Sequence, residues 1–150
     1  MLGGLEQMNK IENINEYPIG GRSFDGKWTR IEPSTEIINA VSFSAGQSKT
    51  YDISSFIASS ASNSDILCYF SIWVRTGTTS GNYSDVGIAS SGFFIKPASI
   101  RTRTSNYMYC SGGAYLPFKA GDRTLTISNQ QQASTITCHF ESYKRLGTNT

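Results

Sequence analysis

Residues 66–75, ILCYFSIWVR, form the strongest strand pattern in the chain. Side chains alternate between the two faces of a strand, so odd and even positions of this stretch lie on opposite faces. One face carries Ile66, Cys68, Phe70, Ile72 and Val74, and the other carries Leu67, Tyr69, Ser71, Trp73 and Arg75. Both faces are largely apolar at the centre, which indicates a central strand covered on both sides. We expect an opposing sheet to cover the first face, and a neighbouring subunit to cover Leu67, Tyr69 and Trp73 as an oligomer interface.

Shorter strand patterns occupy much of the remaining chain. They fall at residues 36–43, 48–53, 83–89, 93–103, 107–110, 114–118, 123–128 and 134–143, and Asp25-Gly26 marks a tight hairpin before them. Gly112-Gly113 predicts a turn between the patterns at 107–110 and 114–118. Residues 54–64 form a loop of small side chains, which Phe56 and Ile57 are expected to anchor in the core. About nine or ten strands with regular turn signals predict an all-β fold, an antiparallel β-sandwich of jelly-roll type. Since no stretch could serve as a crossover helix, a parallel βαβ architecture is excluded.

The first 21 residues differ from the rest. An apolar residue recurs there at every third position, at Leu2, Leu5, Met8, Ile11 and Ile14. This spacing fits neither a straight α-helix nor a coiled-coil heptad well. We expect residues 1–21 to form an arm or short helix that buries its apolar stripe against another subunit, ahead of a β-sandwich domain at residues 22–150. A flexible tail is the alternative.

Composition restricts the classes of function. The chain has 150 residues, 16% of them charged, and a formal net charge of +2. A charged fraction this low, with many Ser, Thr, Asn and Gly residues, is typical of extracellular and virion β proteins. Nucleic-acid binding needs clustered Lys and Arg, so no nucleic-acid partner is expected. No apolar run approaches the ~20 residues that span a bilayer, so no membrane insertion is expected. Without a recognisable signal peptide, release by cell lysis, as for a phage particle, would place the protein outside a cell.

The three cysteines, Cys68, Cys110 and Cys138, form no short-spaced pair, so the usual zinc and redox signatures are absent. Cys68 and Cys138 each lie within an apolar strand pattern, where a free cysteine behaves as a small hydrophobic residue. We expect three reduced thiols. A Cys68–Cys138 bridge stays open, because it depends on whether their strands are neighbours.

Catalytic signatures are also missing. His139 is the single histidine of the chain, and it lies mid-strand beside Thr137 and Glu141. No serine lies in a Gly-x-Ser-x-Gly nucleophile elbow. The carboxylates that could pair for glycoside hydrolysis are Asp52, Asp65, Asp85, Asp122 and Glu141, most of them at turns where Asp normally caps backbone amides. We therefore expect no enzymatic activity, no metal and no cofactor.

The segment 101–115, RTRTSNYMYCSGGAY, has the composition of a binding surface. Tyrosine combines a large apolar ring with a polar tip and is enriched at interfaces. Arg101 and Arg103 share one face of a strand and could meet carboxylates or acidic sugars. With Tyr107, Tyr109 and Tyr115 they form the candidate receptor contact. The alternative is that the tyrosines only pack across strands.

Two blocks of sequence resemble a known family. Residues 17–31, YPIGGRSFDGKWTRI, contain an Ile-Gly step and then Phe24-Asp25-Gly26-Lys27-Trp28, and the chain finishes Ser-Tyr-Lys-Arg-Leu-Gly at 142–147. This pattern is similar to the C-terminal domains of bacteriophage tail-fibre and head-fibre proteins. The insertion of Gly21-Arg22-Ser23 and the lack of a long upstream shaft favour a short head-fibre or decoration protein over a full tail fibre.

The resemblance implies a virion protein whose β-sandwich is commonly homotrimeric. It implies that Leu5, Met8, Ile11 and Ile14 attach the domain to other virion proteins, and that distal loops contact a host-surface glycan. Three other classes remain open: a stand-alone carbohydrate-binding module or lectin, a glycan-degrading enzyme, and a trimeric ligand of the tumour-necrosis-factor type.

Overall fold

The computed structural model describes residues 27–77, 83–101 and 107–146. The expected arm at residues 1–21, the Asp25-Gly26 hairpin and Arg103 lie outside these residues. The strands are β1 (Thr29–Phe43), β2 (Ser48–Asp52), β3 (Ile66–Thr76), β4 (Tyr83–Ser90), β5 (Phe93–Arg101), β6 (Tyr109–Phe118), β7 (Thr124–Asn129) and β8 (Ser134–Arg145). Two short 3₁₀ turns, η2 (Ser54–Phe56) and η3 (Ser59–Ala61), lie between β2 and β3.

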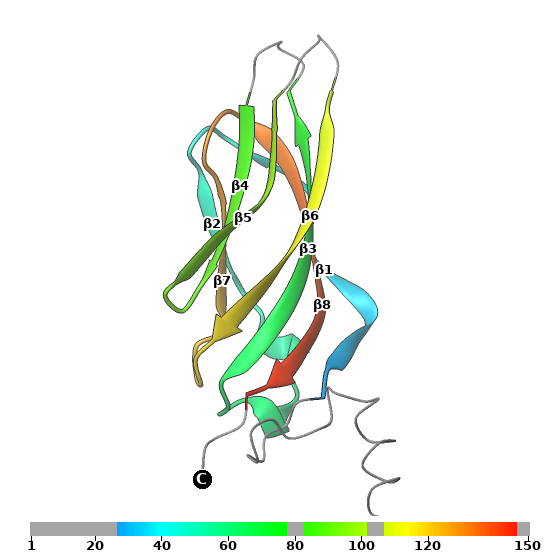
Figure 1. Ribbon diagram of the computed structural model, residues 1–150, viewed down its shortest axis with the longest axis vertical. Helices are drawn as coiled ribbons and strands as arrows, with labels where there is room; N and C mark the ends of the chain where they lie inside the picture. The colour runs from blue at the N-terminus through cyan, green and yellow to red at the C-terminus, as the bar shows by residue number, and fades with distance from the viewer. Residues whose placement is uncertain (1–26, 78–82, 102–106, 147–150) are drawn as a thin grey trace, which may run out of the picture.

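The strands form two four-stranded antiparallel sheets packed face to face (Figure 1). The strand order is β1-β8-β3-β6 in one sheet and β2-β7-β4-β5 in the other. Six of the seven connections between successive strands therefore pass from one sheet to the other, and only β4 and β5 are joined as a hairpin within one sheet. This is the topology of an eight-stranded jelly roll, so the predicted fold class is confirmed.

The described residues contain eight strands, whereas the sequence pattern suggested nine or ten. The pattern at 114–118 and residues 109–110 of the preceding pattern belong to a single strand, β6, whereas residues 107 and 108 lie just before it. The intervening Gly112 and Gly113 suggested a turn, but in the structure both pair with β3, opposite Ile72 and Ser71. Glycine in a strand often marks a close approach of other groups, and both glycines have such neighbours.

The core lies between the two sheets, and β3 runs through its centre. Every second residue of β3 from Ile66 to Thr76 is buried, whereas those between are half-buried or exposed. Phe70 stacks at 5.0 Å from Phe140 of β8 and meets Phe118 of β6 edge-on at 6.1 Å. These ring pairs adopt the tilted and edge-on geometries that aromatic side chains prefer.

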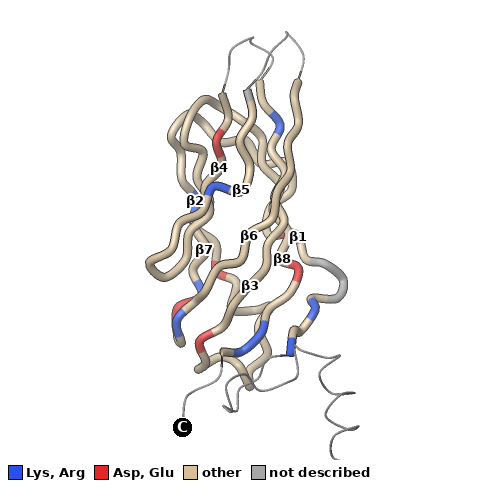
Figure 2. The backbone as a smooth tube through the Cα atoms, in the orientation of Figure 1, with Lys and Arg blue, Asp and Glu red and all other residues tan. Residues whose placement is uncertain are grey.

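The loop between β2 and β3 closes one end of the sandwich. Ile57 is buried and Phe56 packs edge-on against Phe140 at 6.1 Å, so the predicted anchoring by these two residues is confirmed. Tyr143 accepts a hydrogen bond from the backbone N–H of Ala58 at 3.0 Å. Several Lys and Arg residues lie toward this end, where β3 begins and β8 ends (Figure 2).

Candidate functional site

The outer face of the β1-β8-β3-β6 sheet, here called the aromatic face, exposes an unusual number of rings. Trp73 is 42% exposed, Tyr107 49%, Tyr115 55% and Tyr109 69%. Strand alternation accounts for their position, because Trp73 faces away from the buried side of β3, and Tyr109 and Tyr115 face away from the buried side of β6. Exposed apolar patches on soluble domains mark sites of interaction.

One group of rings lies toward the end where β3 begins. Tyr69 is directly opposite Tyr115 on β6, and their ring centroids are 4.7 Å apart. The ring centroid of Trp28, just before β1, lies 5.7 Å from that of Tyr115, and the Lys144 ammonium lies 5.1 Å from the centroid of the Trp28 ring. The three rings form a continuous aromatic cluster with a cation at its edge.

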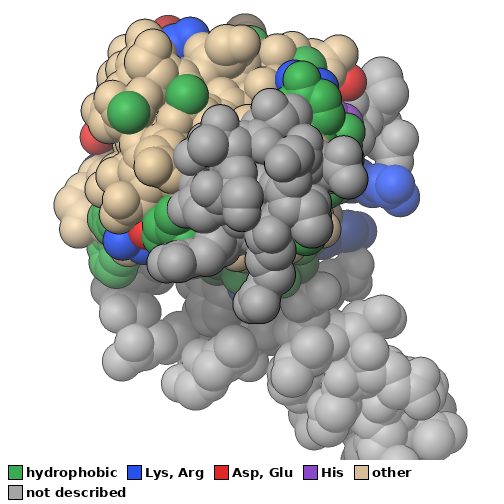
Figure 3. Space-filling model, turned by 90° about the horizontal axis from the view of Figure 1, so that it is seen from above, with side chains coloured by type: hydrophobic (Ala, Val, Ile, Leu, Met, Phe, Trp, Pro, Cys, Tyr) green, Lys and Arg blue, Asp and Glu red, His purple; other side chains and the backbone are tan. Residues whose placement is uncertain are grey.

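A second group lies further along the same face. Tyr109 is directly opposite Arg75, the next outward residue of β3 after Trp73. The Arg75 guanidinium lies 4.4 Å from the centroid of the Tyr107 ring and hydrogen bonds to Thr135 at 3.3 Å. These contacts hold a second exposed aromatic group, separated from the first along the strands. In the view from above, hydrophobic, charged and histidine side chains meet along one side of the molecule (Figure 3).

Polar side chains fill the space between the two groups. Ser71 donates a hydrogen bond to Glu141 at 2.5 Å. The two ring nitrogens of His139 lie 3.4 Å from Glu36 and 4.0 Å from Glu141, and the imidazole meets the Trp73 ring edge-on at 5.0 Å. The centre of the aromatic face therefore presents carboxylates, a hydroxyl and an imidazole beside an exposed indole.

This polar centre does not have the geometry of a serine hydrolase. In that mechanism the serine hydroxyl is hydrogen-bonded to the histidine that removes its proton. Here Ser71 donates to the carboxylate of Glu141, so the serine and the histidine are not coupled as nucleophile and base. The arrangement supplies donors and acceptors to a ligand that lies over it.

The other candidate carboxylates have structural partners. Asp52 accepts from the N–H of Ser54, Asp65 from that of Ala120, and Asp122 from that of Thr124, so the predicted capping by these three is confirmed. Asp85 instead forms an ion pair with Lys96 at 2.8 Å on the opposite sheet. In the described ranges no group of three or more His, Cys, Asp and Glu side chains is placed to hold a metal ion.

All three cysteines are free, and Cys68 and Cys138 are buried. Cys68 lies opposite Tyr143 on β8 and Cys138 lies opposite Ile72 on β3, so the strands are neighbours but the two cysteines are not paired across them. No helix within the described ranges has the length and hydropathy that a membrane span requires.

Residues that were predicted for two separate roles, an oligomer interface and a receptor contact, lie on the same face of the structure. The expected interface residues Leu67, Tyr69 and Trp73 and the expected receptor residues Tyr109 and Tyr115 all lie on the aromatic face. Arg101 is the last residue of β5, in the other sheet.

Four residues of this face were not predicted as binding residues: Trp28, Glu36, Ser71 and His139. The sequence did predict that Ser71 lies on the same side of β3 as Tyr69 and Trp73. The alternation in β8 had already placed His139 and Glu141 on a solvent-facing side. The pairing of His139 with Glu36 and Ser71 depends on the registers of β1 and β3 against β8, and no sequence signal reports those registers.

The fold and this face define the class of the molecule as a jelly-roll β-sandwich with an exposed aromatic sheet surface. No protein-family model and no curated protein matches the chain. Several solved structures show a distant likeness, and the following three are among them.

The first is the CBM22-2 xylan-binding domain of Xyn10C from Paenibacillus barcinonensis, with 7% identity over 89% of this chain and 96% of that chain and a TM-score of 0.39. The second is the CBM22-1–GH10 part of xylanase 10B from Clostridium thermocellum, with 12% identity, a TM-score of 0.36, and 80% of this chain but 24% of that chain covered. The third is a nora virus structure, with 14% identity, 91% and 65% coverage, and a TM-score of 0.40. At these sequence identities and TM-scores, none of the three likenesses indicates a function for this chain.

Proposed function

We propose that this chain is a non-catalytic glycan-binding domain and that the aromatic face holds a short oligosaccharide. The observation that carries the proposal is the alternation on that face of exposed rings and hydrogen-bonding groups. A pyranose ring has an apolar C–H face, which stacks on an aromatic ring, and a rim of hydroxyl groups, which needs donors and acceptors. Trp73 beside His139 and Glu141 offers both kinds of contact.

The spacing of the rings suits a ligand longer than one sugar. Tyr69 and Trp73 are four residues apart on β3, which corresponds to ~13 Å along a strand. The polar centre around Ser71 lies between them. An oligosaccharide that runs along β3 would stack on Tyr69 and Trp73 and place hydroxyl groups over Ser71, His139 and Glu141.

The chemistry of the face favours a glycan over a second copy of the chain. The core of a stable protein interface is depleted in charged residues. The centre of the aromatic face instead holds Glu36 and Glu141 on either side of His139. Leu67, the one aliphatic residue of the expected interface, is already half-buried within the single chain.

Display of this domain on a virion is the second candidate, and the resemblance at residues 17–31 and 142–147 favours it. Jelly rolls occur both in viral capsids and in lectins, so the fold is compatible with either role. In this reading the domain is a homotrimer on a phage particle, and Trp73 lies between subunits. Light scattering at micromolar concentration separates the two: a trimer that Trp73→Ala dissociates supports the virion reading, and a monomer contradicts it.

Isothermal titration with xylohexaose, cellohexaose and mannohexaose tests the glycan proposal. We expect at least one of them to bind, and Trp73→Ala to weaken that binding by about tenfold, as loss of a stacked ring should. Phe93→Ala is the matched control, because Phe93 is 55% exposed but lies at the start of β5 on the other sheet. Binding that Trp73→Ala leaves unchanged, or no binding across a broad array of glycans, would overturn the proposal.

A further inference from the structure

The opposite face of the sandwich holds a second exposed aromatic platform. Phe94 of β5 is 51% exposed and its ring lies over Gly87 of β4. A Cβ at Gly87 would overlap the Phe94 ring and would lie 2.9 Å from the hydroxyl of Ser128. The ring can therefore lie against β4 only because residue 87 has no side chain, while about half of the Phe94 surface stays open to solvent.

A bulge in β5 positions the polar groups beside this ring. Val86 pairs with Ala98 and Ile88 pairs with Ile95, so two residues of β5 lie opposite Gly87 alone. Bulges of this kind redirect side chains and occur next to binding sites. One of the two bulged residues is Lys96, whose side chain is 48% exposed and whose ammonium contacts Asp85 at 2.8 Å.

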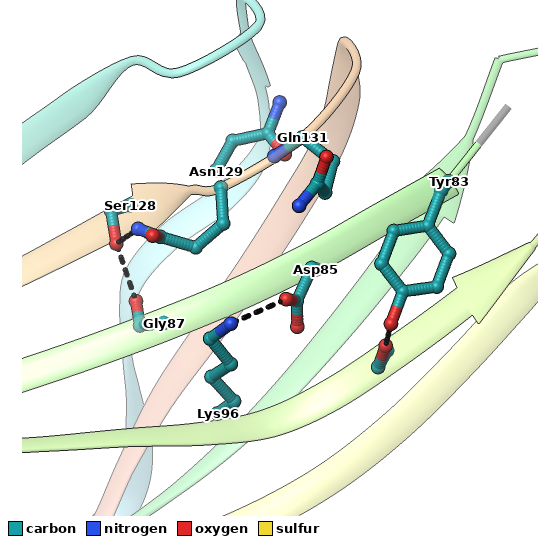
Figure 4. Close-up of polar contacts among 9 residues, drawn as sticks. Tyr83, Asp85, Gly87, Lys96, Ser128, Asn129 and Gln131 are labelled. Atoms are coloured by element: carbon teal, nitrogen blue, oxygen red, sulfur yellow. Dashed lines mark hydrogen bonds and ion pairs between the residues drawn. The ribbon is translucent and has the colours of Figure 1, made fainter.

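The polar groups around the bulge form a fixed set of contacts (Figure 4). Gln130 donates a side-chain hydrogen bond to Ser128 at 2.6 Å, and the Ser128 hydroxyl contacts the carbonyl of Gly87 at 3.5 Å. Tyr83 and Ser99 share a hydrogen bond of 2.5 Å between their hydroxyls. The Asp85 carboxylate is buried, and its hydrogen bond raises the pKa of Lys96, so this ammonium stays charged and oriented.

We infer that this platform is a second saccharide site, which takes one neutral sugar ring at a glycan terminus. The Phe94 ring stacks on the C–H face of the sugar, and Lys96 and Gln130 hydrogen bond to its hydroxyls. A single sugar ring fits because this platform has one aromatic ring, Phe94, whereas the aromatic face of the other sheet has two groups of rings. A neutral sugar fits because the charges of Lys96 and Asp85 compensate each other.

The two sites lie on opposite outer faces of the sandwich, because Phe94 belongs to the β2-β7-β4-β5 sheet and Trp73 to the β1-β8-β3-β6 sheet. One chain could then engage two glycans at once, and on a glycan-dense surface such bivalence raises the apparent affinity without any new contact. This inference rests on Phe94 and its neighbours and does not depend on binding at the aromatic face.

Two glycine amides allow the test to be read separately for each site. The ¹⁵N-labelled chain is titrated with the methyl glycosides of glucose, galactose, mannose and xylose, while the Gly87 amide reports on the Phe94 platform and the Gly113 amide on the aromatic face. We expect one methyl glycoside to shift the Gly87 signal in a saturable way. Phe94→Ala should weaken this binding by about tenfold and Lys96→Met by several-fold.

Controls separate a binding role from a structural one. Phe94→Leu keeps Gly87 covered but removes the aromatic ring of residue 94. This variant should therefore fold like the wild type and still lose the shift of the Gly87 signal. Phe93→Ala and Trp73→Ala should keep the shift of the Gly87 signal. A Gly87 signal that no methyl glycoside moves, or one that moves equally in Phe94→Leu, would overturn the inference. If no hexasaccharide shifts the Gly113 signal while a methyl glycoside still shifts the Gly87 signal, the proposed function is overturned and this inference stands.

Discussion

The phenol ring of Tyr69 lies across Gly113 on the neighbouring strand. A Cβ at Gly113 would lie 2.8 Å from Cζ of Tyr69, well inside van der Waals contact. The missing side chain thus leaves room for the ring to lie along the sheet, where it meets Tyr115 at 4.7 Å. The arrangement of one aromatic group therefore depends on a glycine that contributes no contact of its own.

The substitution Gly113→Ala should displace the Tyr69 ring and leave the fold intact. The clashing atoms belong to the far end of a flexible side chain, so the ring can rotate away, and the cost in unfolding free energy should stay below about 1 kcal/mol. Affinity for the hexasaccharide that the wild type binds should fall several-fold. Urea denaturation and isothermal titration measure the two effects. An unchanged affinity would show that Tyr69 takes no part in binding.

The adjacent substitution, Gly112→Ala, should have the opposite profile. Its Cβ would overlap the carbonyl oxygen of Pro97 and lie 2.9 Å from the carbonyl carbon, and these are backbone atoms of β5 that cannot rotate away. The strands β5 and β6 would have to separate, which we expect to cost about 2–3 kcal/mol of unfolding free energy. Urea denaturation measures this loss, with Gly113→Ala as the matched control one residue away. Equal stability of the two variants would contradict the close β5–β6 contact.

The two glycines also show how far the sequence could predict this structure. Alternation in residues 66–75 was enough to place Phe70 in the core and Trp73 on the outside, because the period of a strand is a local property. The jelly-roll fold class followed from many short strands without helices. Gly112-Gly113 was misread as a turn, because a glycine that relieves a contact with another strand looks the same in sequence as one that allows a turn.

The candidate site could be predicted only in pieces, since it is assembled by register. Tyr69 and Tyr115 are 46 positions apart (115 − 69) and meet because β3 and β6 pair with those residues opposite each other. His139 reaches Glu36 through the pairing of β8 with β1. Register depends on turn geometry and on the packing of the whole sheet. The residue types were therefore recognisable in the sequence, whereas their common surface was not.

Arg123 should be one of the largest single contributors to stability. Its buried guanidinium donates to the carbonyls of Lys119 at 2.7 Å and Ser64 at 2.6 Å, and also to those of Asp122, Ala61 and Ser62. Arg123→Met would leave these carbonyls without their donor, at a cost of about 3 kcal/mol in urea denaturation. Arg123→Lys keeps a charged donor and should lose less. Equal losses for the two variants would contradict a role based on hydrogen bonding.

Thiol reactivity should distinguish the three cysteines. Burial raises the pKa of Cys138 to about 12 and also raises the pKa of Cys68, so neither forms a thiolate in the native protein at neutral pH. Cys110 is half-exposed on β6. A disulfide-exchange reagent at pH 8 should therefore label Cys110 alone in the folded chain and all three in denaturant. Fewer than three labelled thiols in denaturant without reductant would reveal a bridge.

The hydrogen bond between Ser91 and Asp122 should make stability depend on pH. The Ser91 hydroxyl donates to Asp122 at 2.6 Å and, with the N–H of Thr124, lowers the pKa of this carboxyl below its ordinary value. Because the pKa is lower in the folded than in the unfolded state, the stabilisation is fully present above the unfolded value, near pH 4. It is lost as the pH falls through the folded pKa. The expected size is below about 1 kcal/mol, since the group is largely solvated.

Ser91→Ala isolates this contribution when urea denaturation is repeated between pH 2 and pH 7. The difference in unfolding free energy from the wild type should be largest near pH 7 and should shrink toward pH 2. It should not vanish, because Ser91 also accepts a hydrogen bond from the N–H of Lys119 at 3.2 Å, and that contact does not titrate. In an Asp122→Asn background the Ser91→Ala difference should be independent of pH. A difference that grows as the pH falls would mean that the folded state raises the pKa of Asp122, the reverse of what its hydrogen bonds require.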